Sequence, residues 1–262
     1  MLRRGYEVRG WLSAALSALS LMVLAGVLVP ARVARAQDAS KIEEEVHKTL
    51  DNKRFQNVQA AMQGNTVTLT GTVAVLADKE DADNRVHHVH GVKGVDNEIR
   101  VTGGAEVTDE ALRNKLSQEL SYYTVGYGTT AFTNLNIGVQ NGVVTLGGTV
   151  YWPPDKASAL SIVANTPGVK DVVDNIQVQP VSPMDDQLRL RLERVIYGDP
   201  SLQKYAINPA KPIRIQVING NVTLTGVVDS KMDHDIAGIR ANTVPGVFKV
   251  TNDLQVSSGS GK

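Results

Sequence analysis

The chain has 262 residues, balances 27 Lys and Arg against 27 Asp and Glu, and contains no cysteine. The missing cysteine excludes a lipid-anchored bacterial lipoprotein, disulfide bonds, thiolate nucleophiles and cysteine-based metal sites. Residues 37–262 contain 22 basic and 26 acidic side chains, a net charge of −4. This balance gives no basic face of the kind that nucleic-acid binding requires.

The N-terminus predicts a secretory signal peptide over residues 1–36. Arg3, Arg4 and Arg9 precede an uncharged apolar run over 11–29, and a small-residue cleavage site follows at 34–36. The 19-residue run would be about 28 Å long as a helix, so an uncleaved membrane anchor is the alternative. Both interpretations place the rest of the chain in the periplasm.

The remaining chain repeats one pattern three times. Residues 67–73, 144–150 and 222–228 share the form Val-Thr-Leu-x-Gly-x-Val, and a Gly-Val pair begins 20 residues after the glycine of each copy. Fixed internal spacing indicates a repeated structural unit. We therefore expect three domains, over 38–102 (unit one), 106–180 (unit two) and 183–257 (unit three), and a disordered tail over 258–262.

The first half of each unit predicts a helix and two strands. In unit one, a capping box at Ser40 predicts the start of a helix that carries Val46 and Leu50 on one face. A strand is predicted over 58–62, and a second follows after a turn. In this second strand Val and Leu alternate with Thr, which predicts one buried and one polar face.

The second half of each unit predicts a helix and a third strand. Ala82, Val86 and Val89 follow helical spacing, and Gly91 is expected to end the helix in a left-handed conformation. The third strand should end at Val101. Units two and three repeat the scheme, with strands predicted over 135–139 and 213–218. The fold class is therefore α+β: three tandem αββαβ modules, each a small three-stranded sheet with two helices on one face.

This pattern resembles the BON domain, a family of bacterial envelope proteins, over residues 38–101, 106–180 and 183–257. The resemblance implies an αββαβ fold and a protein linked to phospholipid or membrane contact and to osmotic or envelope stress. The sequence departs from lipid-anchored members in lacking cysteine. Units two and three also have a longer segment between the first helix and the first strand than unit one.

Aromatic residues gather in unit two, and four of them form the candidate membrane-binding or partner-binding site: Tyr122, Tyr123, Tyr127 and Trp152. Tyrosine and tryptophan combine an apolar body with a polar tip, which suits a membrane interface or a protein contact. The alternative is that these rings pack the longer segment of unit two onto its own domain.

Histidines gather in unit one. Asp83 and His87 are four residues apart, and His90 lies three residues further on, so a helix would place them on one face. A metal site needs three or four converging ligands, and the sequence assigns no further one. We therefore predict exposed histidines and no metal or cofactor.

The sequence contains no recognisable catalytic motif, so we predict no enzyme. The expected function is that of a periplasmic protein that contacts anionic phospholipid or envelope proteins, in osmotic or envelope-stress protection. The alternatives are a chaperone-like or scaffold protein that binds other proteins through sheet edges, and a subunit of a larger assembly. A nucleic-acid partner is not expected, and the oligomeric state is left open.

Overall fold

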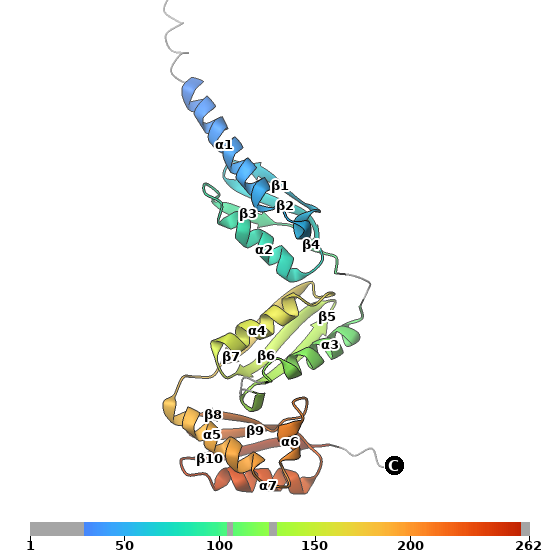
Figure 1. Cartoon of the computed structure of the whole chain (residues 1–262), viewed down its shortest axis with the longest axis vertical. Helices are drawn as coiled ribbons and strands as arrows, with labels where there is room; N and C mark the ends of the chain where they lie inside the picture. Colours follow the sequence, from blue (N-terminus) through green and yellow to red (C-terminus); the bar gives the residue numbers. More distant parts are fainter. Residues whose placement is uncertain (1–28, 104–106, 126–129, 258–262) are drawn as a thin grey trace, which may run out of the picture.

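The computed structural model describes residues 29–103, 107–125 and 130–257, in which three units follow one another along the long axis (Figure 1). Unit one contains α1 (Val29–Thr49), η1 (Lys53–Phe55), β1 (Val58–Gln63), β2 (Thr66–Val73), α2 (Leu76–His87), β3 (Gly94–Asn97) and β4 (Arg100–Val101). Unit two contains α3 (Asp109–Tyr122), η2 (Thr130–Phe132), β5 (Asn134–Gln140), β6 (Val143–Val150), α4 (Pro153–Ala164) and β7 (Asp171–Val178). Unit three contains α5 (Pro183–Tyr197), α6 (Lys204–Ile207), β8 (Arg214–Ile218), β9 (Asn221–Val228), α7 (Lys231–Asn242) and β10 (Lys249–Val256).

The predicted α+β class and the αββαβ order are confirmed in all three units. In each, an antiparallel hairpin is followed by a helix and by a strand that pairs in parallel with the second hairpin strand, which lies at the centre. In unit one the third strand is divided into β3 and β4. The division falls at residues 98–99, where the N–H of Glu98 still donates a 2.8 Å hydrogen bond to the carbonyl of Leu69 in β2.

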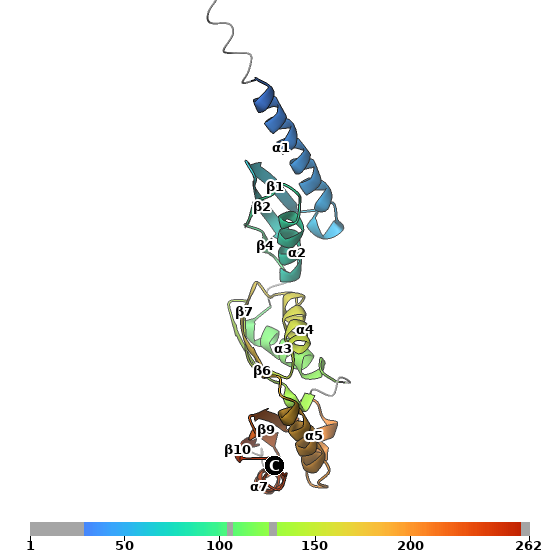
Figure 2. The same cartoon turned by 90° about the vertical axis from the view of Figure 1, so that its left-hand side faces the viewer.

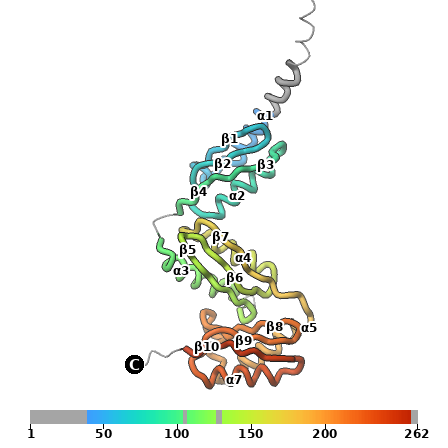
Figure 3. Tube along the Cα trace, turned by 180° about the vertical axis from the view of Figure 1, so that it is seen from behind, coloured from blue at the N-terminus to red at the C-terminus, as the bar shows by residue number. Residues whose placement is uncertain are grey.

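One face of each sheet is covered by helices. Valines and leucines of the central strands, such as Val144 and Leu146, are fully buried beneath the helices, whereas the alternating threonines are half-buried. Figure 2 shows α3 and α4 on the same side of the sheet of unit two, and Figure 3 shows the strands of units one and two from the opposite side. The predicted polar face of each sheet is the one without helices.

The glycine of each repeated motif lies within the central strand at positive φ. Gly71, Gly148 and Gly226 have φ values of 109°, 97° and 130°. A Cβ at Gly148 would lie 2.1 Å from the carbonyl oxygen of Asn134, where β5 begins. The repeated glycine is therefore required because the neighbouring backbone occupies the space of a side chain.

Two details of the sequence prediction are wrong. Helix α1 does not begin at Ser40 but continues upstream to Val29. Gly91 has the predicted left-handed conformation, but α2 ends at His87, so the glycine shapes the following turn and does not cap the helix.

Most of the predicted signal segment and the whole predicted tail lie outside the described residues. Within the described part of the chain, no helix has both the length and the apolar character needed to cross a bilayer.

Candidate functional site

The structure describes three of the four aromatic residues of the predicted site, and they differ in exposure. Tyr122, at the end of α3, is 51% exposed, and Trp152, just before α4, is 46% exposed. Tyr123 is half-buried against the core of unit two, and burial, with the nearby charge of Asp155, raises the pKa of its hydroxyl. Tyr127 lies outside the described residues. Of the three described side chains, those of Tyr122 and Trp152 are thus available on the surface.

Trp152 is held in a fixed orientation. It occupies the N-cap position of α4, and its indole Nε1–H donates a 3.0 Å hydrogen bond to Oδ1 of the buried Asp155. Its chain neighbour Tyr151 packs in the other direction, with its ring 5.6 Å from that of Phe132 and 5.4 Å from the guanidinium carbon of Arg189. The two neighbouring aromatic residues therefore have different roles: Tyr151 lies in the contact between units two and three, and Trp152 remains on the surface.

The end of the longer segment of unit two, at η2, packs into unit three. Ala131 and Phe132 of η2 are 5% and 4% exposed and belong to the same apolar cluster as the core of unit three. Phe132 also accepts a 2.7 Å hydrogen bond at its carbonyl from the side chain of Gln179. Arg214, the first residue of β8, donates a 2.7 Å hydrogen bond from Nε to the carbonyl of Thr133. The sequence interpretation that this segment packs onto its own domain misses this crossing.

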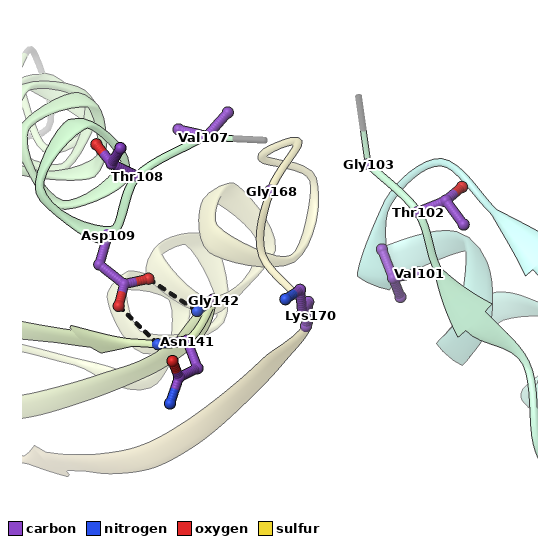
Figure 4. A pocket seen from close by; sticks show the side chains of 10 residues that line it. All are labelled: Val101, Thr102, Gly103, Val107, Thr108, Asp109, Asn141, Gly142, Gly168 and Lys170. Atoms are coloured by element: carbon purple, nitrogen blue, oxygen red, sulfur yellow. Dashed lines mark hydrogen bonds between the residues drawn. The ribbon is translucent and has the colours of Figure 1, made fainter. Parts of the chain in front are cut away.

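The boundary between units one and two contains a cavity of about 450 Å³, in which the end of unit one at Gly103 faces the Gly168 turn of unit two (Figure 4). On the wall formed by unit two, both carboxylate oxygens of Asp109 accept backbone N–H groups, from Asn141 at 2.6 Å and from Gly142 at 2.9 Å. The carboxylate therefore clamps the hairpin turn to the start of α3, which is a structural role.

A buried aspartate recurs at the third position of the second helix in each unit. Asp78, Asp155 and Asp233 are 7%, 6% and 6% exposed. Their partners include basic, hydroxyl or indole groups of the same unit, such as the Arg54 guanidinium at 2.9 Å from Asp78. These carboxylates join the start of a helix to the preceding segment.

Asp233 illustrates the electrostatics of this position. Tyr205 donates a 2.7 Å hydrogen bond to its Oδ2, and the Lys204 ammonium lies 2.9 Å from the same atom. Burial by itself would raise the pKa of Asp233, but these hydrogen bonds and that of Ser230 outweigh it and hold the pKa below its ordinary value. The group is therefore a stable carboxylate and is not poised for proton transfer near neutral pH.

The histidines of unit one lie on the surface. His87, His88 and His90 are exposed, and the Nδ1 atom of His88 lies 2.6 Å from the carbonyl oxygen of Asn84. In the described ranges, no three His, Asp or Glu side chains converge in a way that would hold a metal ion.

Comparison with known proteins agrees with the repeated architecture. The family model of the BON domain matches residues 36–103, 108–180 and 185–258. Osmotically-inducible protein Y of Escherichia coli (strain K12) is 25% identical over 193 residues, which cover 70% of this chain and 90% of that protein.

Among the solved structures that are similar to this chain, two have TM-scores of 0.22 and 0.20. They are the C-terminal domain of CdsD, a structural protein of the type III secretion system of Chlamydia trachomatis (15% identity, TM-score 0.22, covering 81% of this chain and 96% of that one), and the PrgH periplasmic domain (12%, 0.20, 77% and 95%). The family match, by contrast, extends over most of the chain in three separate stretches. The chain therefore belongs to the BON domain family and carries the domain three times.

Proposed function

We propose that this protein is an exported, non-enzymatic component of the bacterial envelope that binds phospholipid surfaces or envelope proteins during osmotic or envelope stress. Three observations support the proposal: the threefold BON domain match, a relative whose name records osmotic induction, and an N-terminus with the layout of a signal peptide. The predicted location is the periplasm.

The observation that carries the proposal is the exposure of Trp152 and Tyr122 on a rigid unit. The bond to Asp155 fixes the indole N–H of Trp152, while 46% of the residue remains exposed. Aromatic residues of this kind gain free energy at a membrane interface or in a protein contact, because their apolar bodies leave water while their polar tips stay bonded. Fixing the side chain beforehand reduces the entropy lost on binding.

The arrangement of the acidic groups supports a role without catalysis. Asp109 is occupied by two backbone N–H groups, and Asp233 is bound by Tyr205 and Lys204. Carboxylates that hold the fold together in this way do not form the pair of acid and base that hydrolytic chemistry requires.

The proposal is tested by co-sedimentation of residues 37–262 with anionic or zwitterionic vesicles at low and high salt. This segment contains every member of the three apolar clusters of the described structure. Binding to anionic vesicles that weakens in high salt is the expected result. Absence of binding to either vesicle would contradict lipid contact and favour a protein partner, to be sought by cross-linking in intact cells.

The role of the aromatic residues is tested with the double variant Tyr122→Ala and Trp152→Ala. Both side chains are about half exposed, so their loss should weaken binding, and the melting temperature should fall only by the amount that the lost hydrogen bond from Trp152 to the buried Asp155 accounts for. Tyr123→Ala provides the contrast, because this half-buried ring contributes to packing and its loss should lower the melting temperature. Unchanged vesicle binding by the double variant would remove these two residues from the site.

A further inference from the structure

Unit three has an apolar tip around its hairpin turn, at the end where α5 begins (Figure 1). Met184 and Phe248 are 82% and 81% exposed, and Ile218 is 37% exposed. The N–H of Phe248 donates a 2.9 Å hydrogen bond to the carbonyl of Gly220, and its ring lies directly over this glycine. We call Met184, Ile218 and Phe248 the apolar tip.

The apolar tip is held by a carboxylate clamp. Asp185 follows Met184, and its two oxygens accept the N–H groups of Asn219 and Gly220, each at 2.9 Å. The residue before Asn219 is Ile218, so the clamp brings two of the three apolar side chains to one turn. Because the backbone at all three positions is fixed by hydrogen bonds or by the adjoining helix, the exposed side chains present a defined surface.

The other two units have polar residues at these positions. Counting from the motif glycine, Phe248 corresponds to Lys93 and Lys170, and Ile218 corresponds to Gln63 and Gln140. The glycines 20 residues after the motif glycine each lie beside a residue of the first helix, which is Ile42, Leu112 or Leu188. Four residues before Leu188 stands Met184, and the corresponding residues of the other units are Asp38 and Thr108. Lys170 even occupies the same place over Gly142 as Phe248 does over Gly220. The fold therefore does not require apolar side chains here, and unit three alone among the repeats has them.

The charge around the apolar tip is positive. Lys249 adjoins Phe248, and the Arg191 guanidinium lies beside Gly246, with Nη2 3.7 Å from the position that a Cβ would take there. Both side chains are exposed, and in the described part of the chain neither joins an ion pair. The nearby carboxylates already have partners, since Asp185 accepts backbone N–H groups of the hairpin turn and Asp186 forms an ion pair with Arg189.

We propose that the apolar tip of unit three inserts into an anionic lipid surface, with Arg191 and Lys249 at the headgroups. Large apolar side chains gain free energy by leaving water for the acyl boundary, and flanking cations add electrostatic attraction to anionic lipid. The site lies on a different unit from Trp152 and Tyr122. The inference rests on the proposed function, because it names the surface through which lipid is bound.

The test uses residues 37–262 and vesicles with and without an anionic phospholipid. The tip variant combines Met184→Thr and Ile218→Gln, the residues of unit two at those positions, with Phe248→Gln. The control variant carries Met232→Thr and Ile239→Gln on α7, where the side chains are 70% and 63% exposed. It therefore removes exposed apolar surface from the same unit but away from the tip.

The tip variant should bind anionic vesicles about tenfold or more weakly, since interfacial affinity follows the apolar area inserted. The control variant should bind like the parent protein, and all three should melt at similar temperatures. Replacing Arg191 and Lys249 by Gln should weaken anionic binding by about fivefold for each cation and should leave zwitterionic binding unchanged.

Insertion itself has a direct spectroscopic readout. In a Trp152→Phe background, the variant Phe248→Trp places the single tryptophan of residues 37–262 at the tip. Its emission should shift to shorter wavelength on addition of anionic vesicles and should be quenched by lipids with quenchers in the acyl chains.

The outcomes separate the two proposals. If the parent protein binds vesicles and the tip variant binds equally well, the apolar tip is not the site while the proposed function stands. If the parent protein binds neither vesicle, insertion of the tip and the lipid contact of the proposed function both fail, and a protein partner becomes the favoured form of that function. An unshifted emission from Trp at position 248 during confirmed vesicle binding would also overturn insertion of the tip.

Discussion

Removing the ring of Phe132 should destabilise unit three, although the residue belongs to unit two. Phe132 is 4% exposed in the core of unit three, and truncation of a fully buried phenylalanine to alanine typically costs about 3–5 kcal/mol. A domain of this size has only about 5–15 kcal/mol of stability. The variant Phe132→Ala should therefore lose a large fraction of the stability of this region.

Urea unfolding followed by circular dichroism measures the free-energy change, and amide hydrogen exchange locates it. Protection should fall in β8, which η2 covers, as well as in unit two itself. The matched control is Phe248→Ala, which makes the same chemical change at a residue that is 81% exposed and should cost less than about 0.5 kcal/mol. A change below about 1 kcal/mol for Phe132→Ala, or lost protection restricted to unit two, would refute the reasoning.

Two further predictions concern stability. Gly148→Ala should destabilise unit two by several kcal/mol, because positive φ and the Asn134 carbonyl at 2.1 Å exclude a Cβ, a strain of a kind that costs about 1–3 kcal/mol before the clash is added. The control is Gly138→Ala, whose Cβ would lie at an ordinary 3.8 Å from Thr145 and which should hardly change the stability. Equal melting temperatures for the two variants would contradict the predicted strain at Gly148. The lowered pKa of Asp233 means that its ionised form stabilises the fold above the unfolded pKa of about 3.9, and this contribution is lost as the pH falls through the folded pKa. Asp233→Asn should flatten the acid limb of the stability curve measured by urea unfolding, and an unchanged limb would exclude this role.

The sequence predicts the fold well because the repeated pattern records local physical requirements. Alternating Val and Thr specify the faces of the central strand, and the motif glycine specifies a place where two backbones meet. Three copies make each requirement visible without a structure. The start of α1 is mispredicted because a local capping signal at Ser40 does not stop a helix whose preceding residues are also compatible with helix.

The candidate site is predicted less well, because exposure and contacts between units depend on packing. The sequence places Tyr122, Tyr123 and Trp152 together by composition, but the turn after α3 buries one ring partly and leaves the others on the surface. The role of Phe132 has no local signal, since an apolar residue in a longer segment can pack onto either neighbour. The apolar tip, in contrast, is visible when the repeats are compared, as Phe248 stands where two lysines stand.

The crossing of η2 into unit three also affects the order of folding. A chain is made from its N-terminus, and domains generally fold in that order. Unit two is complete up to β7 before β8 exists, so during this interval Phe132 can pack on Tyr151 of its own unit but lacks the core of unit three that buries it in the finished protein. This transient apolar surface adds to the tendency of the nascent chain to aggregate during the interval, and assembly of the last unit removes it.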